Sequence, residues 1–577
     1  MVKNIDNIRV AKMLDDIADI LEIIDGNRFR IAANRKAARS IENLSKDIVE
    51  IHKKDNLQTI PGVGKGIAKH IKEMIKTGKS KELEKLRKKI PKGVTKLMEI
   101  EGVGPKKAKL FYKKFGVKSI KGLKKLAKSH KLKDLKGWGQ KSEQNILKGI
   151  KLYKKFSDRF ALGEVYDMTQ KIKKKLAKSD LTKKVEICGS FRRAKETIGD
   201  LDILITSKKP KKAIDFFTSL KQVDQILLKG DTKARVTLKH GPEVDLRVVD
   251  PKSFGAAMHY FTGSKDHNIH IRKLGIKKGL KINEYGIFQK NNKKRIGGKT
   301  EKEIFNAVDL TFIPPEIRED KGEIKAAKNN NLPNLIKQND IKGDLQMHSN
   351  WSDGNASILE MAKACKKKGY KYMAITDHAS PMGMINGINK DNVSDYLKEI
   401  KKANKKIKGL YIFAGCEVDI LSDGSLYLSD NILKKFDIVL AAVHSGFKKP
   451  EKEQTKRVLK AIENKHVNIL AHPTGRMIKK REPINLNINK LIQKAKTTNT
   501  VLEINASWQR LDLKDTQAFL AKKESVKLSI STDAHDPRTL STMRFGVLTG
   551  KRGWLEKKDV INTKSLNSFK KFLKHQK

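Results

Sequence analysis

The segment CGSFRRAKETIGDLDILIT, residues 188–206, decides the fold of the middle of this chain. An apolar strand ends in a Gly-Ser turn, and Asp200 and Asp202 follow on the next predicted strand. Residues two positions apart on a strand point to the same side of a sheet, so both carboxylates face one place. Asp245, within EVDLRVV, can complete the cluster from a neighbouring strand. Converging carboxylates repel one another unless divalent cations lie between them, and magnesium is the expected ion.

Two ions at such a cluster would carry out nucleotidyl transfer. One would lower the pKa of a primer 3′-hydroxyl held by Asp245, and the other would clamp a triphosphate, so that in-line displacement releases pyrophosphate. The strands VEICGS, DLDILIT, RVTLK and EVDLRVV, with a helical stretch near residues 211–221, predict an α+β domain. A bare Asp-x-Asp pair would be an ordinary surface feature, but the preceding GSFRR argues against that interpretation.

The segment YFTGSKDHNIHIR, from Tyr260, resembles a segment of the family X DNA polymerases. The resemblance implies a DNA-templated polymerase that fills short gaps in DNA repair, with a nucleotidyltransferase core over residues 156–320 and the three aspartates as catalytic metal ligands. The nucleotide site that it implies consists of Arg159, Ser190, Arg193 and Gly199 at the triphosphate, Tyr260 and Phe261 at the sugar, Asn268 and Arg272 at the base and minor groove, and Gly263. Glu243 is a departure, because vertebrate relatives carry an arginine there.

An internal repeat lies in the first 150 residues or so, where apolar positions recur at helical spacing. Its copies are LQTIPGVGKGIAKHI from Leu57 and LMEIEGVGPKKAKLF from Leu97, with a degraded third copy from Leu135. Each Gly-Val-Gly turn puts bare backbone amides at a helix start, where they can bind a phosphate without reading bases. The copies resemble helix-hairpin-helix DNA-binding motifs. The expected DNA contacts are Arg30, Arg35, Gly62, Gly64, Lys65, Gly102, Gly104 and Lys106.

The beginning of the chain also resembles the small domain of family X polymerases, which binds the 5′-phosphate of a gap. The resemblance implies a small helical domain over residues 1–90 and a second helix-hairpin-helix region over residues 91–155. Some relatives use a lysine of the small domain as a Schiff-base nucleophile against deoxyribose phosphate, and His70 stands at the matching position. Because imidazole cannot form that imine, 5′-deoxyribose-phosphate lyase activity is not expected.

A polar, asparagine-rich segment over residues 321–340 predicts a linker, beyond which short apolar strands alternate with helices as in a parallel α/β barrel. The motifs GDLQMHSNWSDG, AITDHA, AGCEVDI, AAVHSGF, ILAHPTGR and ISTDAHDP together resemble the polymerase-and-histidinol-phosphatase (PHP) domain over residues 341–577. The resemblance implies a metal-dependent phosphodiesterase that acts at a 3′ end or an abasic site. Its expected metal ligands are Gln346, His348, Asp353, His378, Glu417, His444, His472, Asp533 and His535.

This mixed nitrogen and oxygen set suits manganese, zinc or iron better than magnesium alone, and up to three ions are expected. Arg476 could hold the substrate phosphate. Gln346 departs from the usual His-x-His of the family, and its amide oxygen is a weaker ligand than imidazole. A polymerase with a vestigial PHP domain therefore stays open as an alternative. A template-independent nucleotidyltransferase, which shares the Gly-Ser and Asp-x-Asp elements, is a second. A DNA-binding scaffold is a third, against which the intact aspartate triad argues.

The formal net charge of +60 is spread along the 577 residues, which favours a polyanionic partner such as gapped or nicked DNA. The three cysteines include no CxxC pair, which argues against a disulfide framework or a cysteine zinc site and fits a reducing cytoplasm. No apolar run approaches membrane-spanning length. We therefore expect a soluble, cytoplasmic monomer that binds DNA and deoxynucleoside triphosphates but no membrane.

Overall fold

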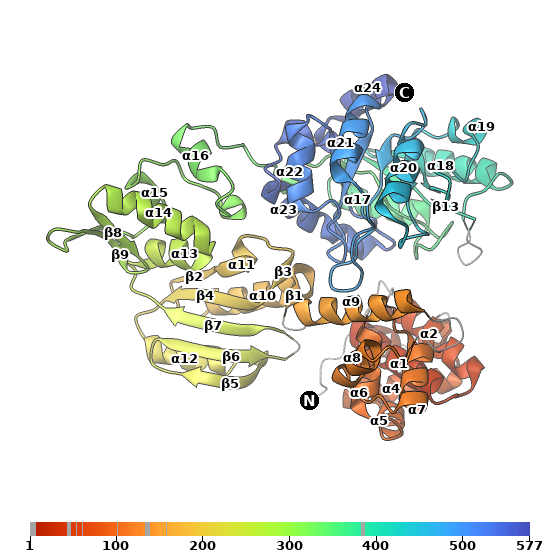
Figure 1. Cartoon of the computed structure of the whole chain (residues 1–577), viewed down its shortest axis with the longest axis horizontal. Coiled ribbons are helices and arrows are strands. Elements are labelled where there is room, and N and C mark those ends of the chain that lie inside the picture. Colours follow the sequence, from red (N-terminus) through yellow and green to blue (C-terminus); the bar gives the residue numbers. More distant parts are fainter. Residues whose placement is uncertain are drawn as a thin grey trace. The chain divides into compact units, whose positions relative to one another are not determined.

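A computed structural model describes residues 7–42, 48–53, 55–60, 62–100, 102–132, 139–156, 159–239, 241–381 and 387–576. The chain forms two compact units, Met1–Ser157 with Lys479–Arg481, and Asp158–Ile478 with Glu482–Lys577 (Figure 1). Within the described ranges, no helix is both long and apolar enough to cross a membrane.

In the described part of residues 1–157, every regular element of the first unit is a helix, as the glycine-punctuated pattern predicts. Its elements are α1 (Asn7–Ile23), α2 (Arg28–Glu42), α3 (Ile48–Lys53), η1 (Leu57–Thr59), α4 (Lys65–Thr77), α5 (Lys81–Arg87), α6 (Lys92–Lys96), η2 (Leu97–Glu99), α7 (Pro105–Phe115), α8 (Ile120–Lys128) and α9 (Gln140–Phe156). Buried apolar side chains form one cluster between Val10 and Val94 and another between Leu97 and Ile150. The two copies of the repeat therefore belong to different hydrophobic cores.

Both copies of the repeat fold as a short 3-10 helix, a glycine turn and an α-helix. Gly62 and Gly102 have φ angles of +86° and +80°, which glycine adopts without steric cost. Gly64 and Gly104 precede α4 and α7, and a Cβ at either position would meet no atom within 4 Å. Bare amides thus stand at both helix starts. The third copy, from Leu135, lies partly outside the described residues.

The second unit begins with the expected α+β core, whose main sheet has the strand order β2-β4-β7-β6-β5. Strands β4 and β7 are parallel, and the other neighbours are antiparallel. Smaller sheets pair β1 with β3 and follow the order β10-β9-β8. The elements are β1 (Phe160–Ala161), α10 (Leu162–Ala177), β2 (Lys184–Ile187), α11 (Gly189–Arg192), β3 (Thr197–Ile198), β4 (Asp200–Thr206), α12 (Pro210–Thr218), β5 (Val223–Lys229), β6 (Lys233–Leu238), β7 (Glu243–Val248), α13 (Phe254–Thr262), α14 (Lys265–Lys277), β8 (Leu280–Asn283), β9 (Gly286–Gln289), β10 (Arg295–Gly297), α15 (Glu301–Asn306), η3 (Pro315–Ile317) and α16 (Glu323–Lys328).

A buried ion network joins α11 and α15. Glu301 pairs with Arg192 at 2.7 Å and with Arg318 at 2.6 Å, and Arg192 also donates to Thr262 Oγ1 at 2.7 Å. Burial alone would raise the pKa of Glu301, but the two guanidinium groups lower it to about 2. Helix α16 lies within the segment expected as a linker, and its buried Glu323 contacts His267 Nδ1 at 2.8 Å.

We expect Glu301→Gln to destabilise the fold by about 3 kcal/mol at pH 7, since the native pKa lies well below the ordinary value. Because folding lowers the pKa of Glu301 from 4.5 to about 2, its stabilisation is complete above pH 4.5 and is lost as the pH falls towards 2. In urea unfolding, the difference in the free energy of unfolding between the wild type and Glu301→Gln will therefore be smaller at pH 3 than at pH 7. Asp224→Asn, at an exposed position of β5, is the control, and a difference independent of pH would contradict the assignment.

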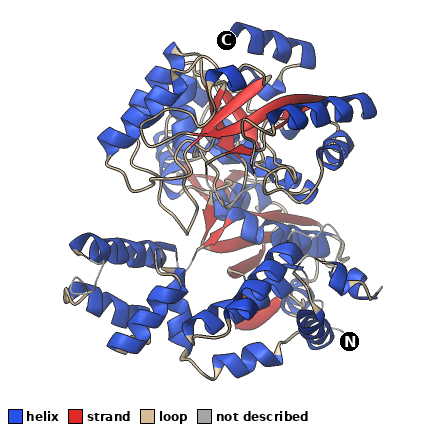
Figure 2. Cartoon of the chain, turned by 90° about the vertical axis from the view of Figure 1, so that its right-hand side faces the viewer, coloured by secondary structure: helices blue, strands red, loops and turns tan. Residues whose placement is uncertain are grey.

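The rest of the second unit is a nearly closed parallel barrel with the order β11-β12-β14-β15-β16-β17-β18, and β13 pairs with β14. Beyond β11 and β18, a bridge between Met347 and Ala534 joins the two ends of the sheet. Figure 2 shows helices around the strands nearest the C-terminus. The elements are η4 (Gln338–Asp340), β11 (Gly343–Asp344), α17 (Ile358–Lys367), β12 (Tyr372–Ile375), β13 (His378–Ala379), α18 (Val393–Lys406), β14 (Tyr411–Asp419), α19 (Asp430–Leu433), β15 (Ile438–Ala442), α20 (Glu451–Ile462), β16 (Ile469–Leu470), α21 (Ile488–Thr497), β17 (Val501–Asn505), α22 (Asp515–Lys523), β18 (Leu528–Ser531), η5 (Pro537–Thr542), α23 (Met543–Arg552), η6 (Lys557–Asp559), η7 (Ile561–Thr563) and α24 (Leu566–Gln576).

The α+β core and the barrel share apolar packing. Leu511 and Phe545 of the barrel belong to the same buried cluster as Leu162 and Val165 of α10. The rings of Phe545 and Tyr166 pack edge to face with their centroids 5.3 Å apart. Helix α10 is therefore a structural neighbour of the loop that follows β17.

Candidate active sites

The aspartates predicted to form a cluster lie on two adjacent strands. Asp202 on β4 stands directly opposite Asp245 on β7, and Asp200 is at the start of β4. Gly189, in the turn after β2, has a φ of +64°, and a Cβ there would lie 2.6 Å from Asp202 Oδ2. Glycine at this position therefore lets the turn approach the carboxylate.

The electrostatics of this cluster fit divalent cations. Burial, followed by the charges of Asp200 and Asp245, raises the pKa of Asp202 to about 7. A cation between the carboxylates would relieve this repulsion. Arg235 on β6 donates Nε and Nη2 to the two oxygens of Asp245, at 2.9 and 2.8 Å, and lowers its pKa. Arg235 thus reaches Asp245 from the adjacent strand β6. Two residues before Asp245, where vertebrate relatives carry an arginine, this chain has Glu243.

The residues expected at the triphosphate form two close pairs. Arg193 Nη1 lies 3.1 Å from the point where a Cβ of Gly263 would be, and Arg159 Nη1 lies 3.1 Å from the corresponding point at Gly199. Ser190 belongs to the short helix α11. Both glycines thus leave space for a neighbouring guanidinium group.

The residues expected at the sugar and base are joined by one hydrogen bond between α13 and α14 and another within α14. Asn268 Nδ2 donates to the carbonyl oxygen of Tyr260 at 2.7 Å, and Arg272 Nε donates to that of Asn268 at 3.3 Å. The rings of Tyr260 and Phe261 pack edge to face at 5.1 Å. Arg247, which no sequence motif indicated, places its guanidinium 4.8 Å from the centroid of Phe261.

Of the residues in the first unit that are expected to contact DNA, the two arginines form ion pairs within the protein. Arg30 pairs with Glu82 at 2.8 Å, and Arg35 pairs with Asp19 and Glu22, each at 2.8 Å. The lysines at the two glycine turns are exposed, namely Lys65 and Lys106. Because these lysines are exposed and lie beside the bare amides, they are better placed than the two arginines to bind a phosphate.

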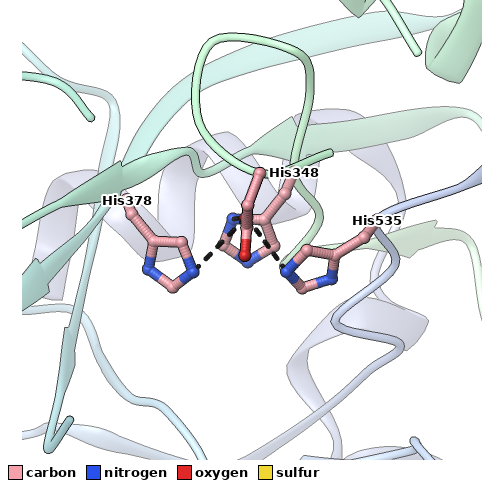
Figure 3. A group of neighbouring side chains, drawn as sticks. His348, His378 and His535 are labelled. Carbon is pink, nitrogen blue, oxygen red and sulfur yellow. Dashed lines mark ion pairs between the residues drawn. The ribbon is translucent and has the colours of Figure 1, made fainter. Parts of the chain in front are cut away.

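A second cluster of ionisable side chains lies where the barrel strands end at their carboxyl side. Three groups bring their ligand atoms within 4.8 Å of one another: His348, Asp353, His378 and His535; His378, Glu417 and His444; and His348, Glu417 and Asp533. Figure 3 shows the imidazoles of His348, His378 and His535 converging from separate segments. The sequence predicted all of these residues as ligands.

Glu417, on β14, is the shared member of two of these groups. Its carboxylate oxygens lie 3.3 Å from His348 Nε2, 3.2 Å from His378 Nδ1, 3.5 Å from His444 Nε2 and 2.9 Å from His472 Nε2. Burial would raise the pKa of Glu417, but the surrounding histidines hold it well below its ordinary value. Four imidazoles, including that of His472, thus lie around one buried carboxylate.

Asp353 and Asp533, the other two carboxylates of the three groups, also pair with histidines. Asp353 lies 3.2 Å from His535 Nε2, and Asp533 lies 3.2 Å from His348 Nε2. Burial and the neighbouring His348 lower the pKa of His378 to about 4, so this ring is neutral at pH 7 and able to bind a metal. Asp533 has a φ of +55°, an unusual value for a residue with a Cβ and one that occurs at functional sites.

Gln346, expected as a ligand, has a side chain that could take that role. Its side chain is fully buried, and neither amide atom has a hydrogen-bond partner among the described residues. Such unpaired buried groups are costly unless something outside the chain completes their bonding. Gln346 stands two residues before His348, and its carbonyl oxygen accepts from Asp533 N at 3.1 Å.

Several contacts around the cluster were not predicted. Asp419 accepts from His444 Nδ1 at 2.6 Å, and Asn505 Nδ2 donates to Asp533 Oδ2 at 3.0 Å. Asp419 stands two residues after Glu417 on the same strand, and this alternation was the signal that could have identified it. Such partners orient metal ligands.

Arg476 was expected at the phosphate, but it is buried with other partners. It donates to the carbonyl oxygen of Leu511 and pairs with Glu196 of the α+β core at 2.8 Å. Arg510 instead lies at the cluster, with Nε 3.5 Å from Asp533 Oδ2.

Five family models match consecutive segments of the chain. They are a helix-hairpin-helix domain at residues 5–80, a SAM-like helix-hairpin-helix tandem at 94–152, the DNA polymerase beta palm at 159–243, the DNA polymerase beta thumb at 257–319 and a PHP domain at 344–507. Their order agrees with the order expected from the sequence motifs.

Three relatives extend this comparison. The chain is 39% identical over 567 residues to the DNA polymerase/3′-5′ exonuclease PolX of Bacillus subtilis, which covers 98% of this chain and 99% of the relative. It is 25% identical over 342 residues to DNA polymerase lambda of Rattus norvegicus, covering 54% of this chain and 56% of that protein. A probable phosphatase of Thermoanaerobacter is 31% identical over 238 residues, which is 39% of this chain and 92% of the phosphatase.

Proposed function

Because this chain belongs to the family X DNA polymerases that carry a PHP domain, it is a DNA polymerase, and we propose that it fills short gaps and trims 3′ ends during DNA repair. The observation that carries the polymerase function is the register of β4 and β7, which sets Asp202 opposite Asp245. We assign Asp200, Asp202 and Asp245 to magnesium, which would activate the primer hydroxyl and neutralise the triphosphate when bound.

The chain's own residues divide the remaining work at the polymerase site. Arg159 and Arg193 would bind triphosphate oxygens, and the space at Gly199 and Gly263 lets both guanidinium groups approach. The hydrogen bond from Asn268 to the backbone of Tyr260 would hold that backbone against the sugar. A backbone wall at this place leaves little room for a 2′-hydroxyl, so deoxynucleotides are the preferred substrates.

For the PHP domain we propose a 3′-5′ exonuclease that also accepts abasic sites, with manganese or zinc as its metal. The nine ligands are Gln346, His348, Asp353, His378, Glu417, His444, His472, Asp533 and His535. Metal bound there would supply hydroxide at neutral pH and polarise the phosphodiester. The convergence of histidines on Glu417 and the unpaired amide of Gln346 support this assignment.

The helix-hairpin-helix turns are proposed to hold gapped or nicked DNA by its phosphates. His70 stands where lyase-active relatives carry a lysine, so the chain has no matching imine-forming residue and we propose no lyase function. We further propose that the enzyme acts as a monomer, in a reducing cytoplasm that suits its free cysteines Cys188, Cys365 and Cys416.

DNA binding will weaken steeply with salt. Each phosphate that a lysine or arginine neutralises releases condensed counterions and adds about −0.9 to the slope of log affinity against log salt on duplex DNA. Lys65→Ala and Lys106→Ala should each make this slope shallower by about one contact. Fluorescence anisotropy over a salt series measures the slope, and a flat response in the wild type would contradict phosphate binding.

One assay on gapped DNA tests the whole proposal. Incubation without nucleotides, then with them, in magnesium and then in manganese, separates hydrolysis from extension. Filling of a short gap in preference to extension of single-stranded DNA is expected. Preferential extension of free single strands would favour the template-independent alternative, and extension without hydrolysis in any divalent metal would favour a vestigial PHP domain.

A further inference from the structure

We propose that Arg510 binds the phosphate of the substrate at the PHP metal centre. This inference deepens the proposed exonuclease function and rests on it. Arg510 would donate to a non-bridging oxygen of the phosphodiester while the metal ligands hold the ions. The class of ligand is a phosphate ester or free phosphate.

Arg510 lies beside one of the proposed metal ligands. It lies in the loop after β17, and its Nε is 3.5 Å from Oδ2 of Asp533, a member of the group formed with His348 and Glu417. Its side chain is 21% exposed, whereas that of Asp533 is 9% exposed, so the arginine lies nearer to solvent. Among the described residues, Asp533 is the only carboxylate within ion-pair distance of Arg510.

The chemistry of guanidinium supplies the second argument. At 3.5 Å the contact with Asp533 is longer than a strong charge-assisted hydrogen bond, so it uses little of the donor capacity of Arg510. The planar group carries further N–H donors in a fork that matches two phosphate oxygens. Arg476, by contrast, directs its Nη2 to the carbonyl oxygen of Leu511 and to Glu196 of the α+β core.

The loop that carries Arg510 is held in place on both sides. Trp508 packs so closely on α10 that a Cβ at Gly163 would lie 2.1 Å from its ring. Ile478 N donates to the carbonyl oxygen of Gln509 at 2.7 Å, and Arg476 donates to that of Leu511. A fixed backbone reduces the conformational entropy that a phosphate-binding arginine would lose.

The test compares Arg510→Ala and Arg510→Lys with Arg538→Ala, which removes an arginine paired with Asp536 after the metal-binding segment. For hydrolysis of a single-stranded 3′ end in manganese, we expect Arg510→Ala to raise KM about tenfold or more. Lysine should recover part of the loss, because it keeps the charge without the fork. Arg538→Ala should stay near the wild-type value.

Two measurements without turnover decide whether Arg510 acts on phosphate or only on Asp533. Manganese binding, followed by electron paramagnetic resonance, should be unchanged in Arg510→Ala, while inorganic phosphate should bind the manganese-loaded protein about tenfold more weakly. Loss of manganese binding, or an unchanged phosphate affinity, would overturn the proposal. A wild type that cuts no DNA refutes the exonuclease function instead, and phosphate binding still decides the role of Arg510.

Discussion

Asp202→Ala and Asp245→Ala will each reduce nucleotide addition by more than about a hundredfold, because loss of a direct metal ligand should cost more than loss of an outer partner. Both residues stand opposite each other on β4 and β7, so either change removes one side of the ion site. Primer extension on gapped DNA with magnesium measures the effect. DNA affinity, measured by anisotropy, should change little, because the glycine turns and their lysines belong to the other unit.

Asp215→Ala, on helix α12, is the matched control for these variants. It removes a surface carboxylate that pairs with Lys229 and lies outside the triad. This variant should extend primers like the wild type. Full extension by Asp202→Ala or Asp245→Ala would refute the assignment of the polymerase site.

His348→Ala and Asp533→Ala will each abolish the manganese-stimulated 3′-5′ nuclease, by more than about a hundredfold, while gap filling continues. His348 takes part in two of the three ligand groups, and Asp533 completes one of them. Asp202→Ala should show the reverse pattern, with nuclease retained and extension lost. Exonuclease assays on a labelled 3′ end, run beside primer extension for each variant, separate the two activities.

Gln346→His will tighten metal binding and raise nuclease activity when metal is limiting, with a smaller effect at saturation. Imidazole is a stronger ligand for manganese or zinc than an amide oxygen, and the buried Gln346 side chain has no hydrogen-bond partner to lose among the residues that the structure describes. Metal titration of both proteins tests this. If the wild type cuts nothing and Gln346→His restores cutting, the natural PHP site is a relic.

The sequence by itself predicted the order of the matched domains and most of the residues proposed for both sites. The Gly-Ser turn and Asp-x-Asp of residues 188–206 predict a metal-binding sheet edge, because strand periodicity alone sets both carboxylates on one face. The barrel ligands were expected from the resemblance of their motifs to the PHP domain, and the five histidines among them lie near the ends of predicted apolar strands, which meet at a common rim. Local motifs carry this information because their geometry is fixed within a few residues.

Only the tertiary structure decided which side chains support those ligands. Arg235 reaches Asp245 because β6 and β7 pair in one register. Arg510, and not Arg476, lies beside Asp533, because the loop after β17 packs on α10 and brings Arg476 to Glu196. Charged side chains on loops have no periodic pattern, and their partners are set by packing between residues far apart in the chain, which the sequence does not display.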